Sequence, residues 1–75
     1  MNVKGHEVTD AQHSAMIDAM SSVEQFRASD IEAVAVSAGV PQGSIANRVV
    51  DRMIQAQRKK GWITLVGRGP YWTTR

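Results

Sequence analysis

The chain contains no cysteine, and this limits most strongly what its 75 residues can fold into. Neither a disulfide bond nor a thiolate-bound zinc ion can hold the domain together. The histidines His6 and His13 lack the further ligands that a zinc site needs, so we expect no metal site. A domain of this size buries only about 60% of the surface that its unfolded chain exposes. Its stability therefore has to come from one small apolar core, to which dimerisation can add.

The first two helices are marked by capping boxes at their amino-terminal ends. Thr9-Asp10-Ala11-Gln12 places a hydroxyl at the N-cap and a glutamine at the third helical position. Apolar residues follow at helical spacing, which predicts a helix from about Asp10 to Ser22. Ser29-Asp30-Ile31-Glu32 has the same pattern and predicts a second helix. Gly39 is expected to end that helix as a left-handed cap.

A third and longer helix is predicted from about Pro41 or Gln42 to Lys60. Proline suits the first turn of a helix, where its missing N–H costs nothing, and Gly61 closes the other end. At about 100° per residue, one side of this helix faces the core with Ile45, Ala46, Val49, Val50, Met53, Ala56 and Gln57. The other side carries Ser44, Asn47, Arg48, Asp51, Gln55 and Arg58.

The carboxyl-terminal segment has the pattern of a β-hairpin. Residues 62–66 and 71–74 are rich in β-branched and aromatic side chains, and the turn cluster Gly67-Arg68-Gly69-Pro70 separates them. Phe26-Arg27-Ala28 is too short for a stable strand by itself, but it can pair at the edge of a small sheet. These elements predict a mostly α fold with a small β-hairpin, of the α+β class.

Residues 9–75 are thus expected to form one domain, and residues 1–8 a flexible amino-terminal arm. The chain has only four aromatic side chains. Trp62 is therefore expected in the core beneath the hairpin, with at least one of Tyr71 and Trp72. Stacking of these rings on single-stranded bases is the alternative use.

Charge is distributed unevenly along the chain. Residues 1–47 carry two basic and six acidic side chains, whereas residues 48–75 carry seven basic side chains and Asp51 as the one acidic residue. A basic end of this kind attracts polyanions, nucleic acid above all. The alternative is a charged surface that serves only solvation.

Several classes of function find no support in the sequence. No apolar run approaches the roughly 20 residues that span a bilayer, and residues 1–10 resemble neither a signal nor a transit peptide. We therefore expect a soluble, cytoplasmic protein without a membrane partner. Asp10, His13 and Ser14 lie within one helical turn, but too little chain surrounds them to form a pocket. With no phosphate loop and no nucleophile motif, neither an enzyme, nor a cofactor, nor a small-molecule ligand is expected.

The junction between the second and third predicted helices is the most informative motif. A helix-turn-helix needs a small residue where the helices cross, a glycine with positive φ in the turn and an apolar residue after it. Ala35, Gly39 and Val40 supply these at the right spacing, and Ile45 continues the core on the next helix.

On these residues the sequence resembles the winged helix-turn-helix family, which includes many bacterial and phage transcription regulators. The similarity continues through residues 44–53, 60–63 and 67–72, and in all covers about residues 9–75. It implies a recognition helix at about 41–60 and a wing at 62–74, with a two- or three-stranded wing sheet. Gly61 lies eight residues after Met53, so this recognition helix is about one turn longer than in family members with a similar start.

The resemblance also implies which residues contact DNA. The recognition helix of such a domain enters the major groove with its amino-terminal residues at the base edges. Base contacts are therefore expected from Gln42, Ser44, Asn47 and Arg48. Contacts to the backbone, or from the wing, are expected from Arg27, Arg52, Arg58, Lys59, Lys60, Arg68 and Arg75.

The expected function is binding of double-stranded DNA as a small sequence-specific transcription regulator. A single module makes few base contacts, so a homodimer on a palindromic site is a further expectation. Two alternatives remain open at this point. One is a winged-helix module for protein–protein contact without DNA binding, since a fold does not dictate a function. The other is a structural or packaging role on DNA, indifferent to sequence.

Overall fold

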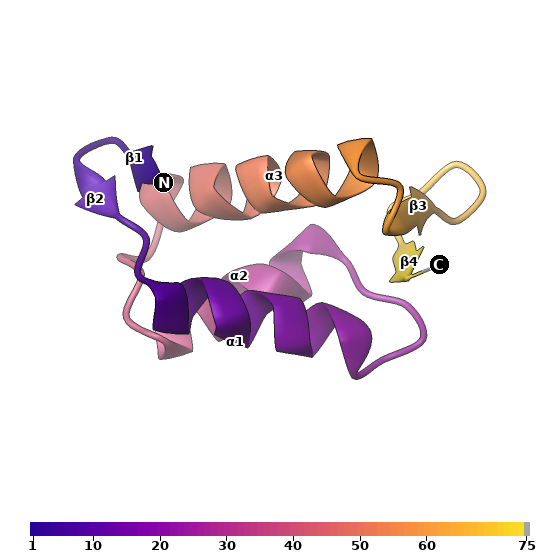
Figure 1. Ribbon diagram of the computed structural model, residues 1–75, viewed down its shortest axis with the longest axis horizontal. Coiled ribbons are helices and arrows are strands. Elements are labelled where there is room, and N and C mark those ends of the chain that lie inside the picture. Colours follow the sequence, from indigo (N-terminus) through magenta and orange to yellow (C-terminus); the bar gives the residue numbers. More distant parts are fainter. Residues whose placement is uncertain (75) are drawn as a thin grey trace.

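The computed structural model describes residues 1–74 and contains three helices and two short antiparallel hairpins (Figure 1). In chain order the elements are β1 (Asn2–Val3), β2 (His6–Glu7), α1 (Asp10–Ser21), α2 (Ala28–Ser37), α3 (Ser44–Lys59), β3 (Ile63–Leu65) and β4 (Trp72–Thr74). This confirms the α+β class. Over these 74 residues, no helix combines the length and the apolar character needed to cross a membrane.

Helix α1 begins as its capping box predicts. The Thr9 hydroxyl oxygen accepts a hydrogen bond from the Gln12 backbone N–H at 3.1 Å, and Gln12 Oε1 accepts one from the Thr9 N–H at 3.1 Å. Two of the donors that a helix start leaves unpaired are satisfied in this way. The prediction of this helix is confirmed to within one residue at its carboxyl-terminal end.

Helix α2 begins two residues earlier than its predicted capping box requires. Its N-cap is Arg27, whose backbone N–H donates to Asp30 Oδ2 at 2.9 Å. The prediction of Ser29 as the cap is therefore wrong. The reason is tertiary: Phe26 is held extended by two backbone hydrogen bonds with Trp72, of 2.9 and 2.8 Å. The chain turns into the helix directly after this pairing, so that Ser29 becomes the second helical residue.

The end of α2 at Gly39 is confirmed. Gly39 has a φ of 107°, in the left-handed region. Its N–H donates to the Val36 carbonyl, and the Val40 N–H donates to the Ala35 carbonyl, both at 3.0 Å. This is the Schellman arrangement of hydrogen bonds, which satisfies the last carbonyls of the helix.

Helix α3 begins at Ser44, so the predicted start at Pro41 or Gln42 is wrong. Gly43 precedes the helix with a φ of 95° and a ψ of −138°, which is not a helical conformation. Pro41 and Gln42 therefore belong to the turn between α2 and α3. The other end agrees with the prediction: the Gly61 N–H donates to Arg58 and the Trp62 N–H to Gln57, a second Schellman arrangement.

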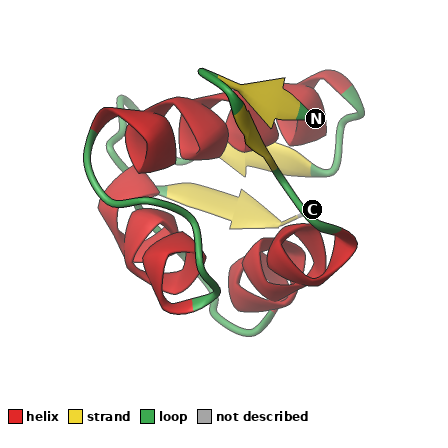
Figure 2. Cartoon of the chain, turned by 90° about the vertical axis from the view of Figure 1, so that its left-hand side faces the viewer, coloured by secondary structure: helices red, strands yellow, loops and turns green. Residues whose placement is uncertain are grey.

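One core lies between the three helices, as the view along the long axis shows (Figure 2). Its fully buried large side chains include Met16, Met20, Phe26, Ile31, Met53 and Ile63. Trp62 and Trp72 are half-buried against this core, whereas Tyr71 is exposed. On α3, Ile54 is buried and Ala56 exposed, which corrects the predicted core side of that helix.

Residues 1–8 form a hairpin that belongs to the domain, in place of the expected arm outside it. Asn2 pairs with Glu7 and Val3 with His6. Val3 is 2% exposed and Val8 8% exposed, so both are core residues. Burial of these two valines removes them from water, and the hairpin contacts α3 through β1 and α1 through the hydrogen bond between His6 and Gln12.

The second hairpin pairs β3 with β4, with Leu65 opposite Trp72 and Ile63 opposite Thr74. Beyond β4, Phe26 forms an isolated bridge with Trp72. The segment around Phe26 therefore does pair at the edge of the sheet, although it is reduced to a single bridge.

Candidate nucleic-acid interface

The outer face of α3 brings together most of the predicted site residues. At about 100° per residue, the exposed side chains lie within roughly 80° of Gln55 around the helix, and all are open to solvent: Ser44, Asn47, Arg48, Asp51, Arg52, Arg58 and Lys59. The buried side chains of the same helix lie on the opposite side, in the common core, and α3 packs against α2, β3 and β1. We call Arg48, Arg52, Arg58 and Lys59 the cationic face.

The structure does not bring Lys60 to this face. Lys60 is the C-cap residue of α3. It lies about 140° around the helix from Gln55. Of the predicted backbone contacts on this helix, Lys60 is therefore the one that points away from the others.

The cationic face keeps its charge available for an external anion. Among residues 1–74, ion pairs within 4.0 Å are formed only by the Met1 amine with Glu7, at 3.3 Å, and by Arg27 with Asp30, at 3.9 Å. Two arginines of the face each donate one solvent-exposed hydrogen bond within the protein. Arg58 Nε donates to Gln55 Oε1 at 3.1 Å, and Arg52 Nη1 donates to the Asn2 carbonyl at 3.4 Å. Asp51 stands on the same face and does not neutralise its neighbours by contact.

The β3–β4 hairpin lies beyond the carboxyl-terminal end of α3 (Figure 1). Arg68 is exposed at its tip, between Gly67 and Gly69. The tip is closed by hydrogen bonds from the Val66 N–H to the Tyr71 carbonyl, at 2.8 Å, and from the Gly69 N–H to the Val66 carbonyl, at 3.0 Å. These bonds close the turn that carries the exposed Arg68. The turn lies at the end of the molecule where α3, and with it the cationic face, ends.

Arg27 and Arg75 stand apart from this group. The Arg27 guanidinium lies 5.6 Å from the centre of the Tyr71 ring and pairs with Asp30. The structure therefore joins Arg27 to Tyr71, at the turn end of the second hairpin, rather than to α3. The predicted contact at Arg75 lies outside the described residues.

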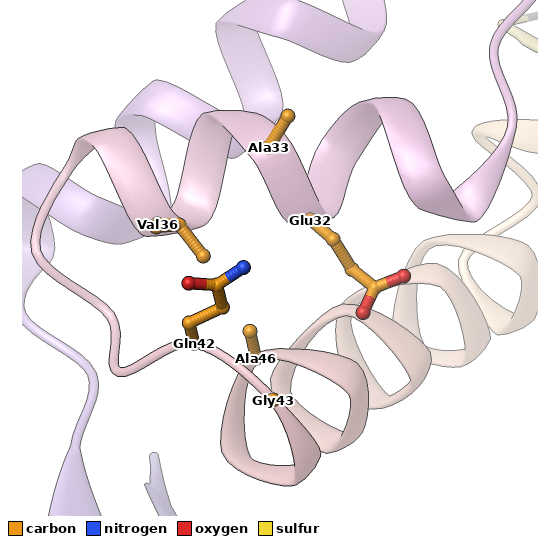
Figure 3. A pocket seen from close by; sticks show the side chains of 6 residues that line it. All are labelled: Glu32, Ala33, Val36, Gln42, Gly43 and Ala46. Atoms are coloured by element: carbon orange, nitrogen blue, oxygen red, sulfur yellow. The ribbon is translucent and has the colours of Figure 1, made fainter.

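A shallow groove of about 510 Å³ lies between α2 and the start of α3 (Figure 3). Gln42 lines it from the turn, and Glu32 and Val36 line it from α2. Figure 3 shows the Gln42 amide directed toward Val36 and the Glu32 carboxylate extended toward α3. Ser44, also expected to contact bases, is exposed in the first turn of α3 and does not line this groove.

Two residues at the edges of this surface are not identified by the sequence pattern. The capping-box pattern explains Glu32 only as a residue of a helix start, although its position on α2 turns its carboxylate toward α3. Lys4 falls within the expected arm, but it lies in the turn of the β1–β2 hairpin, beside the amino-terminal end of α3 (Figure 1). The local signal for this hairpin is limited to Gly5 with Val3 and Val8 on either side, too little for the alternation that marks a strand.

Comparisons with protein-family models, with curated proteins and with solved structures find no match to this chain. The interpretation of the surface therefore depends on its own geometry and charge.

Proposed function

We propose that this protein is a winged helix-turn-helix protein that binds double-stranded DNA as a small sequence-specific transcription regulator. The observation that carries the proposal is the cationic face: four basic side chains on one exposed side of α3, without an ion pair among the residues described. Phosphate neutralisation by such residues supplies most of the affinity of proteins for DNA.

The arrangement of the elements supports this class of fold. Helix α2, the turn at Gly39 and helix α3 follow one another as in a helix-turn-helix. The β3–β4 hairpin follows α3 as a wing does, and the Phe26 bridge lies where a short third strand of a wing sheet would pair. Helix α3 has 16 residues, about 24 Å of length, and its exposed side is free to enter a major groove of about 12 Å width.

Base readout falls to the amino-terminal half of α3. Asn47 and Arg48 are exposed there. Asparagine can bind adenine, and arginine can bind guanine, each through two hydrogen bonds. Gln42, which lines the groove against α2, and Ser44, on the outer face of α3, complete the group of candidate base contacts. Arg68 at the wing tip is suited to the backbone or to a narrow minor groove.

The first test is a salt titration of duplex binding. With about 4–6 phosphates neutralised, the slope of log K against log salt should be about −4 to −5. Selection of bound duplexes from a random library should enrich one sequence, and a palindrome among the selected sites would indicate a homodimer. Absence of binding at low salt, or an affinity independent of salt, would contradict the proposal. Equal affinity for selected and random duplexes would indicate a structural role on DNA instead.

The second candidate function is a winged-helix module for protein–protein contact. The observation that favours it is the exposure of Leu65 (41%), Tyr71 (39%) and Val23 (47%) around the wing end of the molecule. The double variant Arg48→Ala/Arg68→Ala separates the two candidates. Regulation that survives this variant in cells would favour protein contact, whereas loss of regulation together with loss of duplex binding would favour DNA.

A further inference from the structure

We infer that the β1–β2 hairpin is an additional DNA-contacting element, and that Lys4 at its turn binds a backbone phosphate beside the amino-terminal half of α3. This inference rests on the proposed duplex binding. It assigns a role to a segment that lies outside the helix-turn-helix and the wing.

The hairpin is held firmly against the domain. Val3, the residue before Lys4, is 2% exposed in the core. On the other strand, His6 Nε2 lies 3.1 Å from Gln12 Oε1, and Gln12 is itself anchored in the capping box of α1. The turn that carries Lys4 is therefore placed by buried contacts on both of its strands.

The hairpin lies at one edge of the exposed side of α3. Arg52, about 60° around the helix from Gln55, donates to the carbonyl of Asn2 in β1 at 3.4 Å. Asn47, an expected base contact, lies at the other edge, about 80° from Gln55 in the opposite direction. A recognition helix in the major groove has one phosphate backbone on each side. The hairpin therefore stands on the side of one of these two backbones.

The backbone conformation of the turn does not explain a lysine at position 4, which points to a functional role for its charge. Lys4 has a φ of 51° and Gly5 a φ of 85°, so both central residues of the turn are left-handed. Two-residue turns of this kind prefer asparagine, aspartate or glycine at the first position, and a lysine there is not what the backbone favours. Lys4 is exposed, and the nearby Glu7 carboxylate pairs with the Met1 amine instead. The cation at this tip is thus free to bind an external anion.

The experiment compares Lys4→Asn, Lys4→Arg and Ser14→Asp in salt titrations on the selected duplex. Lys4→Asn removes the charge but suits the turn, so it should bind more weakly without a lower melting temperature. The slope of log K against log salt should become less negative by about 0.9, and affinity should fall about five- to ten-fold at 0.1 M salt. Lys4→Arg should restore both. Ser14→Asp, on the solvent face of α1, lowers the net charge equally and is the matched control for long-range attraction.

The contact itself can be located with duplexes that carry one neutral methylphosphonate at a time. At one position, the neutral replacement should lower the affinity of the wild-type protein but leave the affinity of Lys4→Asn unchanged. That phosphate should flank the site of the α3 base contacts. If the wild-type protein binds with the expected salt slope but Lys4→Asn matches it, or matches Ser14→Asp, the role of the hairpin is overturned while the proposed function stands. If the wild-type protein does not bind duplex, the proposed function fails first.

Discussion

At the scale of single residues, the Gln12 side chain connects three parts of the fold. It is 7% exposed. Its Oε1 accepts from the Thr9 N–H at the start of α1 and lies 3.1 Å from His6 Nε2 in β2, while its Nε2 donates to the Ala38 carbonyl at 3.3 Å. Ala38 is the C-cap of α2. One buried amide therefore holds the amino-terminal hairpin and the turn before α3 in a fixed relation, since an unpaired buried amide would be costly.

Gly39 lies close to the Gln12 amide, so a substitution at this position probes how tightly the amide packs on the turn. A Cβ at position 39 would lie 3.1 Å from Gln12 Nε2, and the φ of 107° is unfavourable for alanine as well. Gly61 occupies the same place in the second Schellman arrangement, with a φ of 77° and nothing within 4 Å of the position that a Cβ would take. Gly61→Ala should cost about 1 kcal/mol of unfolding free energy through the backbone alone. Gly39→Ala should cost about 1 kcal/mol more, as measured by urea denaturation; equal losses would show that the Gln12 contact relaxes freely.

At the scale of elements, the β3–β4 hairpin depends on the loop between α1 and α2. Trp72 pairs with Phe26 through both backbone groups, and the Thr73 hydroxyl donates to the Glu24 carbonyl at 2.7 Å. These bonds attach β4 to the loop between α1 and α2, while β3 is held by its contacts with α3 and by the buried Ile63. The position of Arg68 relative to α3 consequently depends in part on contacts made almost 50 residues earlier in the chain.

Thr73→Val should loosen this attachment without changing the shape of the side chain. We expect a loss of about 0.5–1.5 kcal/mol in unfolding free energy. Faster amide hydrogen exchange is expected at Val66 and Trp72, whose N–H groups are bonded within or next to the hairpin. Thr64→Val, on the exposed side of β3, is the matched control and should leave exchange at both amides unchanged. Similar exchange in the two variants would show that the hydroxyl does not secure the hairpin.

At the scale of the whole molecule, the residues that stabilise the fold and the residues that carry the positive charge lie in different places. The core lies between the helices, and the cationic face and Arg68 lie outside it, on α3 and the second hairpin. Acidic residues gather on the other elements, with Asp10 and Asp18 on α1 and Asp30 and Glu32 on α2. We expect this uneven distribution of charge to steer the protein toward a polyanion in a preferred orientation.

The double variant Arg48→Ala/Arg68→Ala should show this separation. Both side chains are exposed, so its unfolding free energy should change by less than about 0.5 kcal/mol. Its salt slope for duplex binding should become less negative by about 2. Met53→Ala, on the buried side of α3, should instead cost about 2–5 kcal/mol and unfold much of the population. Chemical denaturation measures the stability of both variants. A large loss of stability in the double variant would mean that these arginines support the fold.

Local signals were sufficient to predict the three helices and the second hairpin. The Thr9 capping box and the glycine ends at Gly39 and Gly61 each depend on a few neighbouring residues, so they can be read without knowledge of the fold. The concentration of basic side chains after Arg48 is likewise a property of the sequence. Together with the helical period of α3, it was enough to place Arg48 and Arg58 on a common exposed side, which Arg52 also joins in the structure.

Only the tertiary structure decided where α2 begins and what residues 1–8 do. The start of α2 follows from the pairing of Phe26 with Trp72, and the first hairpin follows from burial of Val3 and Val8 in a core built by later helices. The surroundings of Lys4 and the hold of Gln12 on Ala38 arise in the same way. Such contacts join residues far apart in the chain, and their free energy exists only once the helices have packed. That is why the sequence alone could predict the Thr9 cap and the basic residues of α3, but not the β1–β2 hairpin or the contact of Gln12 with Ala38.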